Sequence, residues 1–268
     1  MEKEPFEIIR QAVRSRYGQI ATASAGDCGC STAAACCGGS GADVTPEKIA
    51  LALGYSAHDL AGLPEGANMG LSCGNPKAIA ALKPGETVLD LGSGGGFDCF
   101  LAAREVGPGG RVIGVDMTAE MLSKARTNAA QIGALNVEFR LGEIEHLPVA
   151  DNSVDVILSN CVINLSPDKP QVYREAFRVL RPGGRLAISD VVATAVLPDA
   201  LHQEMALLTA CIAGAETVPR LEEILRTVGF THIRIQPKDE SREVIRKWVP
   251  GRGIEDYIVS AAIEAVKP

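Results

Sequence analysis

The sequence predicts an α/β fold with a doubly wound, mostly parallel sheet, and three observations support this prediction. Short β-rich runs alternate with helical stretches from Glu86 onward, as in sheets wound with helices. Turns rich in glycine and proline, such as Pro108-Gly109-Gly110, separate these runs. With 268 residues, of which 46% are apolar, the chain is long enough to bury a substantial core. Length alone allows one elaborated domain or a core with an appendage.

Residues 1–70 are expected to form N-terminal helices and a Cys-rich loop. Apolar residues between Pro5 and Tyr17 are spaced for one face of a short helix. The glycine-rich stretch 21–42 contains four cysteines and is expected to be a loop. Thr45-Pro46 then provides an N-cap and a first-turn proline for a second helix.

Residues 71–195 are expected to form the core, and residues 196–268 a smaller C-terminal region that completes or covers the sheet. The predicted core strands are Thr87–Leu91, Val112–Asp116, Val137–Leu141, Val154–Asn160 and Arg185–Asp190. The C-terminal region adds helical stretches and the candidate strands Ile233–Gln236 and Tyr257–Ser260.

Charge and cysteine content restrict the function classes. The net charge of −7, without long runs of like charge, argues against nucleic acid binding. The N-terminus lacks a secretory signal, and no apolar run reaches the roughly 18–20 residues of a membrane span. We therefore expect a cytoplasmic protein. In that reducing compartment, eight cysteines suggest metal binding, redox chemistry or catalysis more than a disulfide framework.

A glycine-rich motif indicates a cofactor site. The run from Asp90 to Gly96 follows the first predicted strand and precedes a predicted helix, Phe97 to Val106. Such glycines let the backbone approach a ligand, and the helix end offers free N–H groups. Asp116 ends the second strand about 20 residues later, where doubly wound folds place a carboxylate on ribose hydroxyls. A glycine turn that only permits packing is the alternative, but the strand, helix and acid together favour a nucleotide-type cofactor.

Three cysteines stand at positions that suggest chemistry. Cys161 ends a predicted strand, where open α/β sheets bind ligands. Cys73 lies in a loop ahead of the glycine motif, and Cys211 is expected on a helix inserted after the fifth strand. Each of the three could instead be a small buried hydrophobic residue. That interpretation best suits a fourth cysteine, Cys99, in the helix predicted after the glycine motif. Together, the three can converge beside the cofactor.

Three strings of residues carry a family resemblance. Residues 70–76 (GLSCGNP), 114–118 (GVDMT) and 159–165 (SNCVINL) together resemble the arsenite methyltransferase family, within the Rossmann-like class I methyltransferases. The match runs from about Tyr17 to the C-terminus. This resemblance implies S-adenosylmethionine as cofactor, with an adenine-side loop at residues 141–148. The cofactor-binding residues expected from the motif and the resemblance are Asp90, Gly92, Ser93, Gly94, Gly96, Asp116, Met117, Glu143, Ile144 and Asn160.

The resemblance also implies the substrate site. It implies trivalent arsenic on Cys73, Cys161 and Cys211, methylated stepwise in arsenic detoxification, with a further N-terminal redox cysteine. Cys28, Cys30, Cys36 and Cys37 are the candidates for that cysteine, and Cys36 or Cys37 is preferred.

Elementary chemistry agrees with that substrate. Thiolates suit a soft metalloid, and the arsenic lone pair needs no general base to attack a methyl group. Arsenite or thiol-bound arsenic would be the substrate and thioredoxin or glutathione the reductant. The number of methyl groups added stays open.

Two other functions are compatible with parts of the sequence. A class I methyltransferase acting on carbon or oxygen of a small organic acceptor would leave the three cysteines as coincidental buried residues. A thiol protein that sequesters soft metals would use the nucleotide fold only as a scaffold. A closed zinc site is disfavoured because paired Cys-x2-Cys units are missing. We assign no role to His146 or His202, and we expect a monomer.

Overall fold

The computed structural model describes residues 3–23, 45–198, 204–209 and 211–268. The N-terminal cysteines considered above, Cys28, Cys30, Cys36 and Cys37, lie outside the described residues, as does His202. The predictions made for them therefore stay predictions.

An eight-stranded sheet forms the centre of the molecule, in the order β3-β2-β1-β4-β5-β8-β7, with β6 beside β5. Strands β1 to β6 pair in parallel, whereas β8 runs antiparallel to both β5 and β7. The predicted α/β fold with a mostly parallel sheet is therefore confirmed. The strands are β1 Thr87–Leu91, β2 Arg111–Asp116, β3 Val137–Leu141, β4 Val154–Asn160, β5 Leu180–Ala193, β6 Glu216–Thr217, β7 Thr231–Lys238 and β8 Ile258–Val266.

Helices precede the sheet and connect its strands. The α-helices are α1 Lys3–Thr22, α2 Pro46–Ala52, α3 Ala57–Leu60, α4 Lys77–Ala80, α5 Phe97–Val106, α6 Ala119–Ile132, α7 Lys169–Val179, α9 Met205–Leu208, α10 Val218–Val228 and α11 Arg242–Ile245. The 3-10 helices are η1 Ile163–Leu165, η2 Asp239–Ser241 and η3 Ile254–Asp256. Thr45 caps α2 as its side chain accepts from the backbone N–H of Lys48, which is the N-cap that the sequence predicts.

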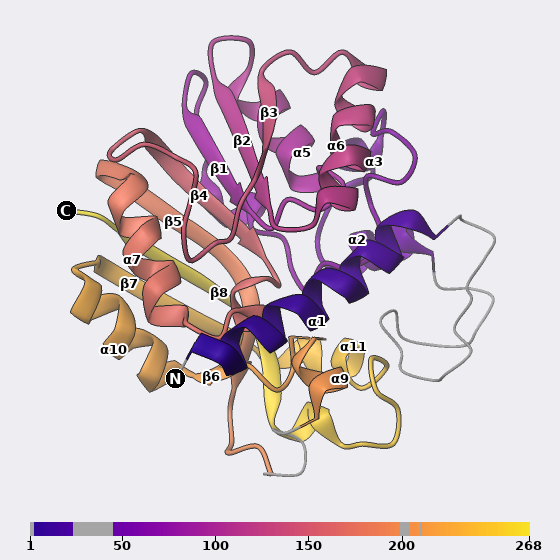
Figure 1. The fold of residues 1–268 in the computed structure, drawn as a ribbon, viewed down its shortest axis with the longest axis vertical. Helices are drawn as coiled ribbons and strands as arrows, with labels where there is room; N and C mark the ends of the chain where they lie inside the picture. The colour runs from indigo at the N-terminus through magenta and orange to yellow at the C-terminus, as the bar shows by residue number, and fades with distance from the viewer. Residues whose placement is uncertain (1–2, 24–44, 199–203, 210) are drawn as a thin grey trace.

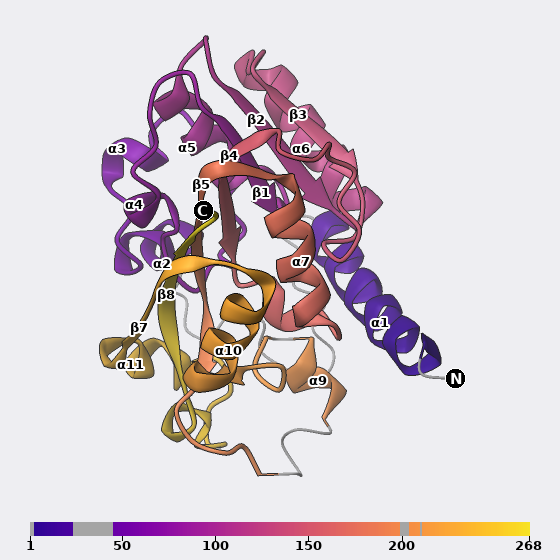
Figure 2. The ribbon, with the colours of Figure 1, turned by 90° about the vertical axis from the view of Figure 1, so that its left-hand side faces the viewer.

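Side chains of the central strands are buried on both faces of the sheet. Val88 packs into the apolar cluster beneath α5 and α6, while its neighbour Leu89 packs into the cluster beneath α7 and α10. The same alternation holds along β4, where Val156 and Ile157 enter opposite clusters. Figure 2 shows α5 and α7 on opposite sides of the strands. Continuous apolar strands are expected for a sheet covered on both faces.

The strand order reverses next to β1. The chain runs from β1 to β2 and β3 on one side, and then returns to place β4 and β5 on the other side of β1. Open α/β sheets bind ligands at such a switch point, outside the carboxyl ends of the strands. In Figure 1, α1 crosses the molecule at that edge of the sheet. The fold therefore places an N-terminal helix beside the expected cofactor crevice.

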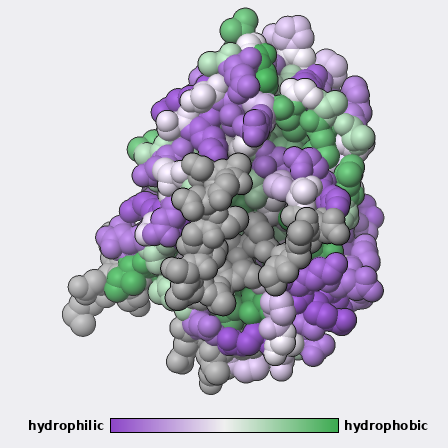
Figure 3. Space-filling model, turned by 90° about the vertical axis from the view of Figure 1, so that its right-hand side faces the viewer, coloured by the Kyte–Doolittle hydropathy of each residue, from purple (hydrophilic) through white to green (hydrophobic). Residues whose placement is uncertain are grey.

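One face of the molecule is largely polar where described residues form it. Outside the residues drawn in grey, the side in Figure 3 is mostly hydrophilic with small, separate apolar areas. No helix within the described residues combines the length and apolar character needed to cross a membrane.

Candidate active site

The glycine motif forms the tight turn between β1 and α5. Gly92, Gly94 and Gly96 all have positive φ, a region that side chains disfavour. A Cβ atom on Gly92 would lie 2.3 Å from Cγ2 of Val162, and one on Gly95 would lie 3.0 Å from the carbonyl oxygen of Gly66. The loop can therefore lie this close to Val162 and to the backbone of Gly66 only because these positions carry no side chain.

A cleft of about 1030 Å³, open solvent included, lies beside this loop. Most of the predicted cofactor residues line it, namely Asp90, Gly92, Ser93, Gly94, Asp116, Met117, Ile144 and Asn160. Gly96 instead precedes α5 as its N-cap. The Glu143 carboxylate lies 2.5 Å from Arg14 Nη2 and 3.4 Å from Arg10 Nε. Glu145, two residues on, contributes to the cleft wall.

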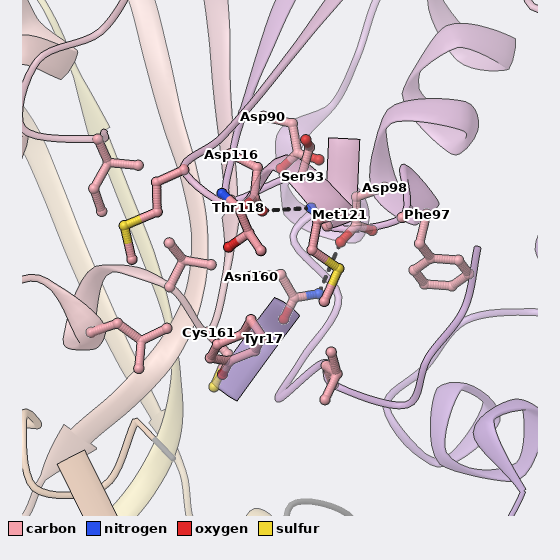
Figure 4. A pocket seen from close by; sticks show the side chains of 18 of the residues that line it. Tyr17, Asp90, Ser93, Phe97, Asp98, Asp116, Thr118, Met121, Asn160 and Cys161 are labelled. Atoms are coloured by element: carbon pink, nitrogen blue, oxygen red, sulfur yellow. Dashed lines mark hydrogen bonds between the residues drawn. The ribbon is translucent and has the colours of Figure 1, made fainter. Parts of the chain in front are cut away.

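Three acidic side chains line the cleft: Asp90 and Asp98 are buried, and Asp116 is half-buried at the end of β2. Burial raises the pKa of Asp90, Asp98 and Asp116 above the ordinary value, and the charge of Asp98 raises that of Asp90 further. Asp116 accepts hydrogen bonds from the backbone N–H groups of Gly94 (3.0 Å) and Thr118 (2.8 Å). Figure 4 shows these acids along the cleft. A cationic ligand nearby would favour the ionised forms of these acids and so lower their pKa values.

Asn160 connects the cleft to the loop that carries Cys73. Its side-chain nitrogen donates to Asp98 Oδ2 and to the carbonyl oxygen of Gly74, both at 3.0 Å, and its oxygen accepts from the backbone N–H of Cys73 at 3.1 Å. The hydroxyl of Tyr55 donates to Asp98 at 2.7 Å. Figure 4 shows the bond between Asn160 and Asp98. Sequence reasoning missed Asp98, although its place just after the glycine motif was a signal, and nothing marked Tyr55.

Cys73, Cys161 and Cys211 are brought together in one buried cluster. The thiol of Cys211 donates to the carbonyl oxygen of Cys161 at 2.7 Å. The sulfurs of Cys73 and Cys161 and a carboxylate oxygen of Asp190 all lie within 4.8 Å of one another. Cys161 also lines the cofactor cleft, beside Tyr17 in Figure 4. Three thiols from distant parts of the chain thus meet at one end of the cleft.

These thiols are protonated near neutral pH. Burial raises the pKa of Cys73 to about 11. The hydrogen bond with Cys211 lowers the pKa of Cys161, but the hydrogen bond with Cys73 and burial together outweigh it, so this pKa lies well above the ordinary value. The pKa of Cys211 is raised by its hydrogen bond with Cys161 and by burial. Formation of three bonds from sulfur to a ligand would therefore require the loss of three S–H protons.

The predicted helical position of Cys211 is wrong. Helix α9 ends at Leu208, and Cys211 lies in a turn with a φ of +64°, which a right-handed helix does not allow. This turn brings the Cys211 thiol to Cys161. Cys99, by contrast, packs in the apolar cluster with α5 as expected, and its thiol donates to Asp90 at 3.2 Å.

Helix α1 supplies a wall of the cleft that sequence reasoning missed. Arg10, Val13 and Tyr17 line the cleft, and the Arg10 guanidinium lies 3.5 Å from Glu145. The apolar spacing of α1 predicted a buried helix face, but no sequence signal indicated that this face meets a cofactor site. Burial raises the pKa of Tyr17 well above its ordinary value, so its hydroxyl stays neutral.

Comparisons with known proteins agree with this geometry. A family model described as "Methyltransferase domain" matches residues 82–229. A phosphoethanolamine N-methyltransferase of Haemonchus contortus, solved with S-adenosyl-L-methionine, has the same fold. It is 21% identical in sequence and superposes with a TM-score of 0.62, and the match covers 84% of this chain and 57% of that one. The fold and the glycine motif define a class I methyltransferase that uses S-adenosylmethionine.

The more similar relatives define the family. An arsenite methyltransferase of Halobacterium salinarum is 56% identical over all of this chain and 68% of that protein. One from Aquipseudomonas alcaligenes is 51% identical over 58% of this chain but only 47% of its own length. The crystal structure of an arsenic(III) S-adenosylmethionine methyltransferase from Chlamydomonas reinhardtii, 34% identical, superposes with a TM-score of 0.62 and covers 84% of this chain and 74% of that one. The chain belongs to the arsenite methyltransferase family.

Proposed function

We propose that this protein transfers methyl groups from S-adenosylmethionine to trivalent arsenic bound by Cys73, Cys161 and Cys211. The observation that carries the proposal is the meeting of these three thiols at the end of the cofactor cleft. A trigonal set of sulfur ligands suits a soft metalloid better than imidazole or carboxylate. The names of the relatives support the same substrate.

The residues of the cleft fit S-adenosylmethionine. Asp116 stands at the end of β2, where this class of fold binds ribose hydroxyls. The hydroxyl of Ser93 is buried without a hydrogen-bond partner and lines the cleft, so a polar ligand would satisfy it. Asp90 and Asp98 complement the positive charges of the sulfonium and ammonium groups. When bound, the cofactor supplies an electrophilic methyl carbon whose thioether leaving group is neutral.

The protonated thiols determine how arsenic binds. Each cysteine replaces one hydroxyl of arsenous acid, forming an S–As bond while the thiol proton leaves with that hydroxyl as water. The arsenic lone pair remains and can attack the methyl carbon without a general base. Alignment of this kind supplies up to about 7–11 kcal/mol of barrier reduction. The protein therefore acts mainly by positioning and by excluding water.

A second methylation needs electrons, because arsenic is formally oxidised by two electrons when it gains a methyl cation. Two thiols can deliver them by forming a disulfide, which thioredoxin or glutathione then reduces. We assign the N-terminal partner of that disulfide to Cys36 or Cys37. Because this cycle requires free thiols, the reducing cytoplasm is its proposed compartment.

The test measures labelled methylarsenicals formed from arsenite, labelled S-adenosylmethionine and a dithiol. Wild-type protein should give labelled product, and Cys161→Ser should give none while S-adenosylmethionine still binds. Cys99→Ser is the matched control, because it changes a buried thiol that lies outside the three-cysteine cluster. It should give labelled product and bind arsenite with the affinity of the wild type.

Each alternative predicts a different result. A sequestering protein would bind arsenite without consuming cofactor, and a methyltransferase for an organic acceptor would tolerate Cys73→Ser and Cys211→Ser. Absence of labelled product from folded wild-type protein that binds the cofactor would refute the proposal.

A further inference from the structure

Two of the three clustered cysteines have unusual backbone conformations. Five non-glycine residues have positive φ in the described part of the chain, and Cys161 (+58°) and Cys211 (+64°) are two of them. Such conformations are costly for residues with a side chain and persist only when the surroundings impose them. The structure must therefore contain contacts that hold both cysteines in place.

Asn164 lies between the two cysteines and makes those contacts. It is buried in η1, three residues after Cys161. Its side-chain nitrogen donates to the carbonyl oxygen of Val191 at 2.7 Å and to Asp190 Oδ1 at 3.0 Å, with the carbonyl oxygen of Cys211 at 3.4 Å. One amide thus joins the turn after Cys161, the end of β5 and the segment of Cys211.

Asp190 holds that turn from the other side. Its carboxylate accepts from the backbone N–H groups of Ile163 (3.0 Å), Asn164 (3.3 Å) and Val191 (2.8 Å), in addition to the Asn164 amide. A carboxylate has about four acceptor positions, so these donors occupy it. Although Asp190 lies close to the sulfurs of Cys73 and Cys161, it serves the site by fixing the backbone, not as a ligand for arsenic.

The segment of Cys211 also packs directly on the backbone of Asn164. A Cβ atom at Gly214 would lie 2.0 Å from the carbonyl oxygen of Asn164. Because that atom belongs to the backbone of a buried turn, it cannot move aside cheaply. Gly214 is therefore needed for the approach that places the Cys211 thiol on Cys161.

We propose that Asn164 is a positioning residue that holds Cys161 and Cys211 in contact before arsenic arrives. The inference rests on the proposed function, because it concerns the same thiols. Two thiols already in register need no ordering when the metalloid binds, and such preorganisation increases affinity. Loss of the Asn164 amide should separate the thiols without changing their chemistry.

The test compares Asn164→Ala with Asn136→Ala. Asn136 is the matched control because its amide also donates to two backbone carbonyls, of Ala103 (3.1 Å) and Gly107 (3.0 Å), away from the thiols. Arsenite affinity is followed by the fluorescence of Trp248, the single tryptophan, which packs against the apolar cluster that contains the three cysteines. We expect Asn164→Ala to weaken arsenite binding about 10- to 100-fold, with an unchanged dissociation constant for S-adenosylmethionine. Asn136→Ala should retain wild-type arsenite affinity.

A second readout does not depend on arsenic. Diamide removes two hydrogen atoms from a pair of adjacent thiols and leaves a disulfide, which peptide mass mapping assigns. The disulfide between Cys161 and Cys211 should form more slowly in Asn164→Ala than in wild type and Asn136→Ala. If wild type binds no arsenite but this difference appears, the substrate proposal fails while the positioning role holds.

Gly214→Ala provides an independent displacement of Cys211. If Asn164→Ala does not fold, Gly214→Ala should show the same loss of arsenite affinity and the same slower disulfide formation. The positioning role of Asn164 would be overturned if folded Asn164→Ala, or Gly214→Ala in its place, kept the wild-type arsenite affinity and rate of disulfide formation. It would also be overturned if Asn136→Ala lost as much arsenite affinity as Asn164→Ala.

Discussion

Substituting Gly92 by alanine tests whether the glycine motif is required by space or only by backbone conformation. Gly92 has a φ of +67°, and its added Cβ would lie 2.3 Å from Val162 Cγ2. Gly133, at the end of α6, has a similar φ of +63° with nothing within 4 Å of an added Cβ. Gly133→Ala is therefore a control that has the backbone strain without the steric clash.

The expected magnitudes follow from these two environments. A left-handed backbone conformation costs a residue with a side chain about 1–2 kcal/mol, so both variants should lose this much free energy of unfolding. Overpacking of a tight site costs about 1–3 kcal/mol more, and it applies only to Gly92→Ala because Val162 is β-branched and has few alternative rotamers. We expect a loss in the free energy of unfolding of about 2–5 kcal/mol for Gly92→Ala and about 1–2 kcal/mol for Gly133→Ala.

Thermal unfolding and cofactor binding together measure the difference. Each kcal/mol lowers Tm by about 2–4 °C in a chain of this size. Val162 also lines the cleft, so its displacement should weaken S-adenosylmethionine binding in Gly92→Ala and not in Gly133→Ala. Equal losses of Tm and equal cofactor affinities in the two variants would show that the clash with Val162 does not matter, and the close-approach argument would be wrong.

Two further predictions concern protons. The pKa of Cys73 is raised to about 11, and those of Cys161 and Cys211 are also raised, so arsenite binding should release water but no protons. Calorimetry in buffers of different ionisation enthalpy should therefore find no proton exchange between about pH 6.5 and 8.5. A release approaching three protons would contradict the protonated thiols. Because burial raises the pKa of Asp90 and Asp98, these acids gain protons as pH falls and the cleft loses negative charge, so the dissociation constant for S-adenosylmethionine should rise on acidification. Asp98→Asn should bind more weakly at neutral pH and respond less to pH, whereas a constant that does not change with pH would remove the electrostatic argument.

The sequence identified the features that depend on near neighbours along the chain. Alternation of β-rich and helical runs is local, and it predicted the first four strands to within one residue of their observed bounds. The fifth strand was predicted as Arg185–Asp190 but extends over Leu180–Ala193, because its pairing with β4 and β8 continues beyond the apolar run. The glycine motif is also local, because the turn after β1 takes positive φ at Gly92, Gly94 and Gly96 and leaves no room for a side chain beside Val162. The prediction that Asp116 binds the cofactor has the same origin, because the spacing between the glycine motif and the end of the second strand is fixed by this type of fold.

The approach of residues that are distant in sequence was decided by the tertiary structure. The cysteine types and their places suggested convergence, but only packing put Cys211 in a left-handed turn against Cys161, where the sequence indicated a helix. Nothing in the sequence distinguishes Asn164 from any other polar residue after a strand. Its importance comes from the tertiary structure, in which its amide joins the turn after Cys161 to β5 and to the segment of Cys211. The sequence predicted an apolar face for helix α1 but not what that face packs against, because periodicity indicates only that a face is buried. The sequence thus determined which chemical groups are available, and long-range packing determined which of them meet.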